Sequence, residues 1–583
     1  MKTKIFIAIA LIFALSGALF ADKDHDLELA RRFLVIEEYE KAIEPLERLY
    51  RQYPDDPEVQ QLLKEAYLGA KKYDKLASLL ESMLLANPDD PRLWVDLGGV
   101  YLSQNQIDKA MDAFDHAVKL APKNVAITLQ IHTLLQQWSF IDEDIKFLKS
   151  ARKRLGDKTL FALELARLYE IKGDFKNVVK EYRLYLKAHP DRFSEVEHRI
   201  AISDRTPEEL AQLRDELKSL FDTDVPKWQP WRLISLIDQK LGDYSAALDA
   251  LIKAENFRDD RRRGALMAGF VKDMLAAGRY DVAEKGARYL IEHAGRNYAL
   301  SGKLYIARAY RAQGKFDLAL AQLDSLLGSN PAPSLAENAA ILMADILLEN
   351  LHNPDSAQRV VDNFVEKSPQ ASRDEDFYFV RGKILIHRRE FERAKNFLRQ
   401  ATAAFQESQK LAYLLGMTYF FAGSYDTANI ALHNIVAHFP KSRWGNEGVE
   451  LLLIMQVAGD NVDKLREPLF LMFIHDTTGA LKLWRKLAGD KSLADVGDYI
   501  LWKSALCQLT LGDPDAAATL EQLVQKYPES FYAPLAYEKL ADMQLAAGNP
   551  ARAVEIYTKI VNDYPDAVNL ESVRDKLAKF GNF

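Results

Sequence analysis

Histidines that could bind a metal ion do not fall at the spacing that a metal site on a helix needs. The closest two, His433 and His438, are five residues apart, whereas the two ligands of an HExxH motif are four apart and share one helical face. The sequence contains no HExxH. We therefore predict no metal site and no cofactor.

Other signatures of catalysis are also incomplete. Residues 489–492 (GDKS) and 156–159 (GDKT) lack the adjacent Gly-Lys pair and the upstream glycine of a phosphate-binding loop. No G-x-S-x-G sequence exposes a serine nucleophile. Cys507 is the single cysteine, so no disulfide can form within the chain. We predict that the protein is not an enzyme.

Two basic clusters, residues 152–154 (RKR) and 261–263 (RRR), are the segments that could contact nucleic acid. The second directly follows Asp259 and Asp260, and the formal net charge of the chain is -7. An acidic chain whose basic residues form short clusters is better explained by solvated helix ends. We predict no nucleic-acid partner.

The N-terminus has the pattern of a cleavable secretory signal. Lys2 and Lys4 precede an apolar run at residues 5–20, which is shorter than the roughly 20 residues that span a bilayer as a helix. Cleavage after Ala18 or Ala21 fits the small residues there, and an uncleaved anchor is the alternative. Residues 1–21 are therefore predicted to be a signal peptide.

The mature chain is predicted to be periplasmic or otherwise extracytoplasmic, with a bacterial origin itself an inference. No cysteine follows the signal, so it is not expected to be a lipoprotein. No second apolar stretch is long enough to cross a membrane; residues 469–474 (LFLMFI) are bounded by Pro468 and His475. We expect no transmembrane segment after cleavage.

The structural elements that would position a functional site recur along the chain at a regular spacing. Prolines at positions 54, 88, 122 and 190 are separated by 34, 34 and 68 residues. Hydrophobic residues make up 48% of the sequence and charged residues 28%, which is ordinary for a folded protein. A 34-residue period over such a composition predicts one array of repeats rather than several globular domains.

One repeat carries a recognisable consensus. Between Pro88 and Pro122 the sequence follows the pattern W-x2-L-G-x2-Y, A-x3-F, P, at Trp94, Leu97, Gly98, Tyr101, Ala110 and Phe114. The chain therefore resembles the tetratricopeptide repeat family. The resemblance implies an all-α fold, a superhelical solenoid of antiparallel helix pairs with a C-terminal capping helix. It also places Cys507 at a buried packing position.

Turns between the paired helices repeat a glycine followed two residues later by an aromatic residue. The glycines are Gly173, Gly242, Gly278, Gly314 and Gly423. Glycine ends a helix by adopting positive φ, which other residues adopt less readily. We expect each of these glycines to do so.

The register of the repeats divides the mature chain. Residues 22–192 form five units, of which the fourth is degenerate because His132 and Asp144 occupy positions of small residues. The later segments are a helical insertion at 193–227, six units at 228–442, a divergent helical region at 443–496, two units at 497–567 and a capping helix at 568–583. Thr206 and Glu209 form a capping box inside the insertion.

The C-terminal pair of units carries a more specific sequence pattern. Lys526-Tyr527-Pro528-Glu529-Ser530 is followed by Ala533 and Ala536. This pattern resembles periplasmic family members such as the Tol-Pal coordinator and the lipoprotein that assists β-barrel assembly. The absence of a lipid-attachment cysteine counts against the second relative.

The resemblance also implies which residues face a partner. In several separate units, inner positions of the first helix carry a cation. These residues are Arg31, Arg167, Arg308, Arg311 and Lys383. These could receive an acidic peptide or a carboxylate, or they could only keep a groove soluble. No unit has asparagine at the ninth position, so the chaperone-carboxylate clamp of some relatives is not implied.

Aromatic and apolar residues share these inner positions in two adjacent units. They are Phe379, Ile386, Tyr413, Met417, Phe420 and Phe421. An apolar stripe suits an amphipathic or extended segment laid into a groove. Core packing is the equal alternative, since Phe420 and Phe421 are adjacent.

The leading hypothesis is a non-catalytic scaffold that binds protein or peptide partners on its concave surface in the cell envelope. A glycan-binding or polysaccharide-export accessory role is the alternative, because sugars stack on exposed rings. An enzyme within residues 443–496 is a distant third.

Overall fold

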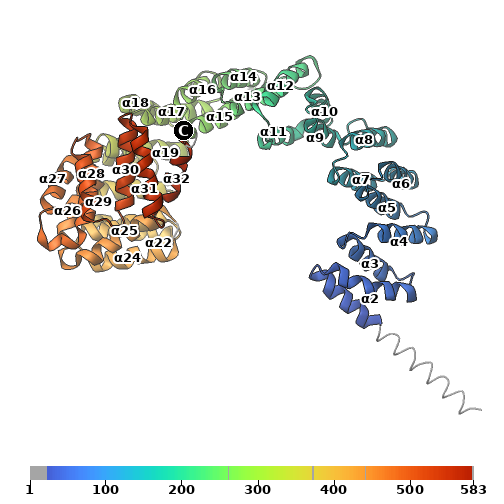
Figure 1. The fold of residues 1–583 in the computed structure, drawn as a ribbon. Coiled ribbons are helices and arrows are strands. Elements are labelled where there is room, and N and C mark those ends of the chain that lie inside the picture. The colour runs from blue at the N-terminus through green and yellow to red at the C-terminus, as the bar shows by residue number, and fades with distance from the viewer. Residues whose placement is uncertain (1–22, 260–261, 370–372, 440–441, 581–583) are drawn as a thin grey trace, which may run out of the picture. The chain divides into compact units, whose positions relative to one another are not determined.

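The computed structural model describes residues 23–259, 262–369, 373–439 and 442–580. Every regular element among them is a helix (Figure 1). The described residues fall into two compact units, one that ends at Phe257 and one that begins at Arg258. The predicted all-α fold of antiparallel helix pairs is therefore confirmed.

The first unit begins with a helical segment at residues 23–35. The elements that follow are α2 (Tyr39–Gln52), α3 (Pro57–Gly69), α4 (Tyr73–Ala86), α5 (Pro91–Ser103), α6 (Ile107–Leu120), α7 (Val125–Gln137), α8 (Ile141–Leu155), α9 (Ala162–Ile171), α10 (Phe175–Ala188), η1 (Pro190–Arg192), α11 (Phe193–Ile202), α12 (Pro207–Leu217), η2 (Lys218–Asp222), α13 (Trp228–Lys240) and α14 (Tyr244–Asn256).

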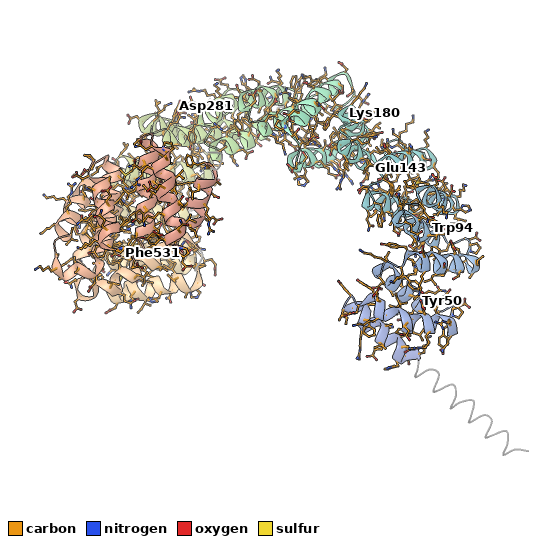
Figure 2. The ribbon with its side chains drawn as sticks, viewed as in Figure 1. Tyr50, Trp94, Glu143, Lys180, Asp281 and Phe531 are labelled. Atoms are coloured by element: carbon orange, nitrogen blue, oxygen red, sulfur yellow. The ribbon has the colours of Figure 1, made fainter. Side chains whose placement is uncertain are left out.

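The consensus residues of the repeat explain how a helix pair packs. A Cβ atom on Gly98 of α5 would lie 2.3 Å from the ring of Phe114 of α6, so only glycine lets the two helices approach this closely. Trp94, labelled in Figure 2, stacks on His116 with ring centroids 4.5 Å apart. Its Nε1 donates to the carbonyl of Pro88 at 2.9 Å and so ties the helix to the preceding turn.

Acidic or amide side chains begin several helices. Asp56, Asp90 and Asn124 each accept hydrogen bonds from backbone N–H groups in the first turn of α3, α5 and α7. Proline follows Asp56 and Asp90 at the first helical position, where its missing N–H costs nothing. The repeated Pro54 and Pro88 lie three residues before these helix-starting prolines, in the turns that precede α3 and α5.

Left-handed residues end the first helix of most pairs. The five glycines predicted to do so have φ values between 68° and 78°. Other turns place a non-glycine residue there, among them His352, Arg389 and His475, with φ of 49°, 58° and 60°.

The degenerate fourth unit keeps its fold through a buried polar pair. Asp144 of α8 is fully buried, and its Oδ2 lies 2.8 Å from Nδ1 of His132 of α7. Burial raises the pKa of Asp144, and the hydrogen bond with His132 opposes this rise. A polar contact therefore replaces the small-residue contact used in the other units.

Between α10 and α13 the chain forms η1, α11, α12 and η2 instead of a regular pair. Both halves of the predicted capping box are present: Glu209 N–H donates to Thr206 Oγ1, and Thr206 N–H donates to the Glu209 carboxylate. Leu210, Leu213 and Leu217 bury one face of α12. This face packs on α10 and α13.

The elements of the second unit are α15 (Ala265–Ala276), α16 (Tyr280–His293), α17 (Arg296–Ala312), α18 (Phe316–Gly328), α19 (Pro333–Asp345), η3 (Ile346–Asn350), α20 (Pro354–Lys367), α21 (Glu375–His387), α22 (Phe391–Ala404), α23 (Gln409–Phe421), α24 (Tyr425–His438), α25 (Arg443–Ala458), η4 (Gly459–Asn461), α26 (Asp463–Phe473), α27 (Thr477–Leu487), η5 (Lys491–Val496), α28 (Gly497–Leu511), α29 (Ala516–Lys526), α30 (Ala533–Ala546), α31 (Pro550–Asp563) and α32 (Leu570–Ala578). The short element η3 is a π-helical turn.

Residues 443–496 fold back on earlier repeats of this unit. Phe470 of α26 contacts Phe421 of α23 and Phe391 of α22, with ring centroids 5.4 and 5.8 Å apart. Glu467 accepts two hydrogen bonds from Arg389, 78 residues earlier. These contacts join segments far apart in the sequence, which a strictly regular array does not do.

The last helix, α32, covers the end of the final pair. Val573 is fully buried, and Lys576 donates to Glu538 and Asp542 of α30. In the part of the chain that the structure describes, no helix combines the length and apolar character needed to cross a membrane.

Candidate partner-binding surfaces

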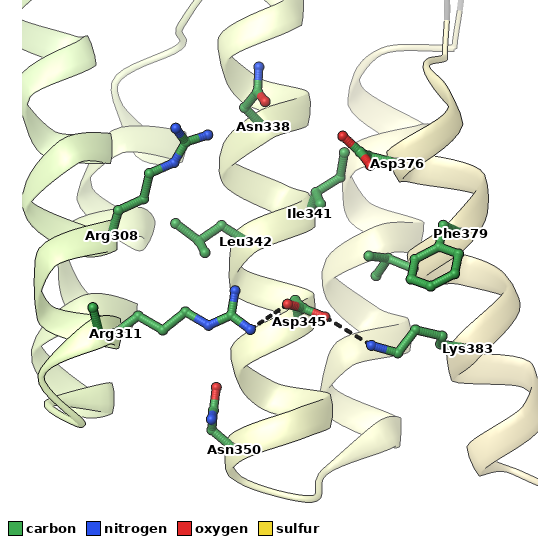
Figure 3. A pocket seen from close by; sticks show the side chains of 12 residues that line it. Arg308, Arg311, Asn338, Ile341, Leu342, Asp345, Asn350, Asp376, Phe379 and Lys383 are labelled. Atoms are coloured by element: carbon green, nitrogen blue, oxygen red, sulfur yellow. Dashed lines mark hydrogen bonds and ion pairs between the residues drawn. The ribbon is translucent and has the colours of Figure 1, made fainter. Parts of the chain in front are cut away.

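A hollow of about 640 Å³ lies along α17, α19 and α21, the first helices of three consecutive pairs. Four residues predicted from their repeat positions line it: Arg308, Arg311, Phe379 and Lys383. Figure 3 shows the arginines on one side, the α21 residues on the other, and Asp345 between them. The helix-pair repeat places them together because equivalent positions of successive first helices face the same way.

Only some of the charged side chains in this hollow have an ion-pair partner. Asp345 accepts from Arg311, and Lys383 Nζ lies 3.3 Å from its other carboxylate oxygen (Figure 3). Lys383 also pairs with Glu349. Arg308 is exposed and has no ion-pair partner among the residues that the structure describes. The hollow therefore offers one uncommitted guanidinium.

Apolar side chains form the rest of the wall. Ile341, Leu342 and Val380 line the hollow together with the ring of Phe379. Lys383 Nζ lies 5.6 Å from the centroid of that ring. A carboxylate on Arg308 and an apolar side chain against Leu342 could thus be bound side by side.

A second hollow, of about 560 Å³, lies where α9 meets the insertion helices α11 and α12. Arg167, Arg199 and Arg205 line it. The guanidinium of Arg205 forms an ion pair with the carboxylate of Glu170, with Nη2 and Oε1 2.7 Å apart. Arg167 is exposed, and neither it nor Arg199 has an ion-pair partner in the described ranges. Glu170, Asp204 and Glu209 line it as well, so the first unit carries a hollow of mixed charge that includes the predicted residue Arg167.

The remaining predicted cation, Arg31, is placed differently. Its guanidinium pairs with Glu58 of α3, and both side chains are about half exposed. The pair is a solvated contact between neighbouring helices, of a kind that contributes little to stability.

The predicted apolar stripe is largely core. Phe420 and Ile386 are fully buried, Phe421 is 2% exposed and Met417 8% exposed. Phe420 packs against Phe421 and Tyr425 with ring centroids 5.8 and 5.6 Å away. Phe420 and Met417 therefore cannot contact a partner without rearrangement, because large side chains here fill the space between helices.

Tyr413 remains partly accessible and belongs to a small aromatic cluster. Its ring lies 5.2 Å from Trp444 of α25, and Trp444 lies 5.8 Å from Phe379. Burial raises the pKa of Tyr413, and the charge and hydrogen bond of Glu447 add to this. Trp444 was not predicted as a site residue, because the divergent region gives it no repeat position; its type, next to Arg443, was the only available signal.

The single cysteine lies in the core of the second unit. Cys507 is 1% exposed, as predicted, and burial raises the pKa of its thiol to about 11, which makes a thiolate unfavourable. Within the described ranges, no three histidine, cysteine or acidic side chains are grouped to hold a metal ion.

Comparison with known proteins agrees with the repeat architecture. Tetratricopeptide repeat models match residues 63–136 and residues 411–442, 499–530 and 535–567, and a tetratricopeptide repeat-like domain matches residues 259–418. No curated protein matches the sequence.

Two solved structures align over most of the chain. The structure of Naa15/Naa10 bound to HypK-THB is 14% identical, with 96% of each chain covered and a TM-score of 0.26. The APC/C hetero-tetramer Cut9-Hcn1 is 13% identical, with 90% of this chain and 98% of that chain covered and a TM-score of 0.28.

Proposed function

Because the chain belongs to the tetratricopeptide repeat proteins, a family of typically non-catalytic interaction scaffolds, we propose that it binds protein partners in the bacterial cell envelope. The hollow along α17, α19 and α21 is the proposed principal site. The observation that carries this proposal is Arg308, an uncommitted guanidinium beside an apolar wall.

The proposed ligand is an extended acidic segment of a partner protein. Its carboxylate would pair with Arg308, and a neighbouring apolar side chain would lie against Leu342 and Phe379. Arg311 and Lys383 are already committed to Asp345, so they are expected to position the site rather than supply its main charge.

A peptide-binding measurement tests this assignment. Labelled decapeptides that alternate aspartate with leucine are titrated by fluorescence anisotropy against the wild-type chain and Arg308→Glu. Reversing the central charge is expected to weaken binding at least tenfold at low salt, since an attraction becomes a repulsion.

Arg399→Glu is the matched control, because Arg399 is an exposed cation on α22 outside the hollow. It should bind like wild type. Equal binding by wild type and Arg308→Glu, or equal losses in both variants, would refute the assignment to this hollow.

The envelope location rests on the N-terminal pattern of Lys2, Lys4 and the apolar run at residues 5–20. Residues 1–22 lie outside the described residues, so this part of the proposal stands on sequence alone. Cell fractionation with N-terminal sequencing of the mature protein is the direct test. A full-length protein in the cytosol would contradict export.

Glycan binding is the second candidate, supported by the cluster of Phe379, Tyr413 and Trp444. Sugars stack on aromatic faces, and these three rings come from consecutive first helices. Peptidoglycan sedimentation should then weaken in both Tyr413→Ala and Trp444→Ala. Sedimentation that is unaffected by either substitution would remove this candidate.

A further inference from the structure

A contact between residues 126 positions apart closes one side of the second unit. His475, at the corner between α26 and α27, hydrogen-bonds through Nε2 to the carboxylate of Glu349 in η3. Lys383 of α21 pairs with the same carboxylate. His387, also on α21, has its Nε2 3.9 Å from Glu349 Oε1. Three separate elements therefore meet at one acidic group.

The backbone at this junction departs from the regular repeat on both sides. Glu349 lies in a π-helical turn, and such turns are rare and often occur at functional sites. His475 has φ of 60° in a turn position where Gly314 and Gly423 stand in other pairs. A non-glycine residue is less favourable there, and at this turn its side chain makes the contact with Glu349.

His387 occupies the most enclosed position of the cluster. Its side chain is 4% exposed, its ring centroid lies 5.5 Å from that of Phe473 on α26, and its Nε2 is buried without a hydrogen-bond partner in the described residues. Burial lowers the pKa of His387 to about 4, although the charge of Glu349 opposes this. A neutral His387 is therefore compatible with the packed junction.

The pKa values of Glu349 and His475 shift in opposite directions. Burial disfavours ionised Glu349, but the hydrogen bond from His475 and the charge of Lys383 outweigh it and lower its pKa to about 2. The same hydrogen bond raises the pKa of His475. The remaining charged or titratable groups that face His475 are Asp345, His352, Lys539 and Cys507.

We propose that Glu349, His387 and His475 form a proton-sensitive clasp, which holds the α26–α27 corner against η3 and α21 and thereby sets the shape of the hollow at Arg308. Lys383 provides the link, because its Nζ contacts Glu349 and Asp345 and its side chain lines the hollow. The link to partner binding rests on the proposed function; the clasp itself does not.

The two histidines give the clasp opposite responses to pH. The contribution of His475 is present below its ordinary pKa of 6.5 and is lost as pH rises through its raised pKa. The contribution of neutral His387 is present above 6.5 and is lost as pH falls toward about 4. The closed clasp is thus most stable near neutral pH, and acid releases it through His387.

Hydrogen exchange followed by mass spectrometry tests the clasp in the full chain without a partner. Protection of residues 346–353 and 470–477, corrected for the chemical exchange rate, is measured at pH 5, 7 and 8.5. In the wild type we expect several-fold less protection at pH 5 than at pH 7, because the loss from protonating His387 exceeds the gain from protonating His475. Helices α28 to α31 should keep their protection, which shows that the unit remains folded.

Two variants distinguish the contribution of His387 from that of His475. His387→Leu should keep its protection at pH 5, because leucine fills the apolar site without a proton to gain. His475→Gly suits the left-handed turn but removes the contact, so both segments should lose protection at pH 7. His433→Ala, an exposed histidine on α24, should match wild type.

Several results would overturn the clasp. They are equal wild-type protection at pH 5 and 7, the same acid-induced loss in His387→Leu, and unchanged protection at pH 7 in His475→Gly. If the decapeptides fail to bind while exchange follows the expected pattern, the proposed ligand is wrong and the clasp stands.

Discussion

At the scale of single residues, one buried polar pair of the first unit is satisfied by its own two members. His132 and Asp144 replace two small residues of the repeat consensus, yet the pair of helices α7 and α8 still forms because the two side chains bond to each other. A buried polar group without a partner costs about 1–3 kcal/mol, and a charged one costs more. The degenerate unit is therefore sensitive to loss of either side chain.

His132→Leu should destabilise the first unit by about 2 kcal/mol or more, because it leaves Asp144 buried without a hydrogen-bond partner. Urea unfolding followed by circular dichroism measures the loss. The double variant with Asp144→Leu should recover part of the stability, since both polar groups are then gone. A single variant as stable as wild type would contradict this account of the unit.

At the scale of helices, close approach within a pair depends on glycine and alanine at fixed positions. Gly98 and Gly269 both lie inside helices, but a Cβ at Gly98 would strike Phe114 whereas nothing lies within 4 Å of one at Gly269. Glycine inside a helix ordinarily costs about 1 kcal/mol relative to alanine. The contact at Gly98 reverses this preference.

Gly269→Ala should therefore stabilise its unit by about 0.5–1 kcal/mol, while Gly98→Ala should destabilise its own by about 1–3 kcal/mol through overpacking. Chemical denaturation of both variants beside wild type provides the comparison. Shifts of the same sign in the two variants would show that the packing at Gly98 is not what requires glycine.

The helices could be predicted from sequence because their signals are local. Proline and a capping acid begin helices, glycine ends them, and consensus residues such as Trp94 and Phe114 fix each pair. Repeat position alone also assigned Arg308, Arg311, Phe379 and Lys383 to the inner surface, and the structure places them in one hollow. Sequence left Phe420 open between core and surface, because an inner position does not distinguish a surface from the space between helices; the structure buries it.

The junction of Glu349 with His475 had no such signal. It depends on a π turn and on α26 folding back onto α22 and α23, and both are set by tertiary packing in a region where the repeat register is lost. The same loss of register hid Trp444. Sequence periodicity predicts contacts between neighbouring repeats only, because the period relates each unit to the next one along the chain.

At the scale of the whole molecule, the chain divides into two compact units at residues 257 and 258. Each contains complete helix pairs and its own hollow, one at Arg167 and one at Arg308. In repeat proteins stability is summed over neighbouring repeats, so each unit should hold its structure by itself.

Residues 22–257 and 258–583, produced separately, should each be helical and should each unfold cooperatively. The full chain should then show two transitions by urea unfolding, because the units need not unfold together. Loss of helicity in either isolated fragment would contradict the division into independently stable units.

Site-specific photo-crosslinking in the living cell shows whether the hollow at Arg308 receives a partner. A photoreactive amino acid replaces Asn338, an exposed residue that lines the hollow. We predict a discrete crosslinked protein that disappears in the Arg308→Glu background and persists in Arg399→Glu. A crosslinked protein that is equally abundant in all three backgrounds, or none at all, would contradict it.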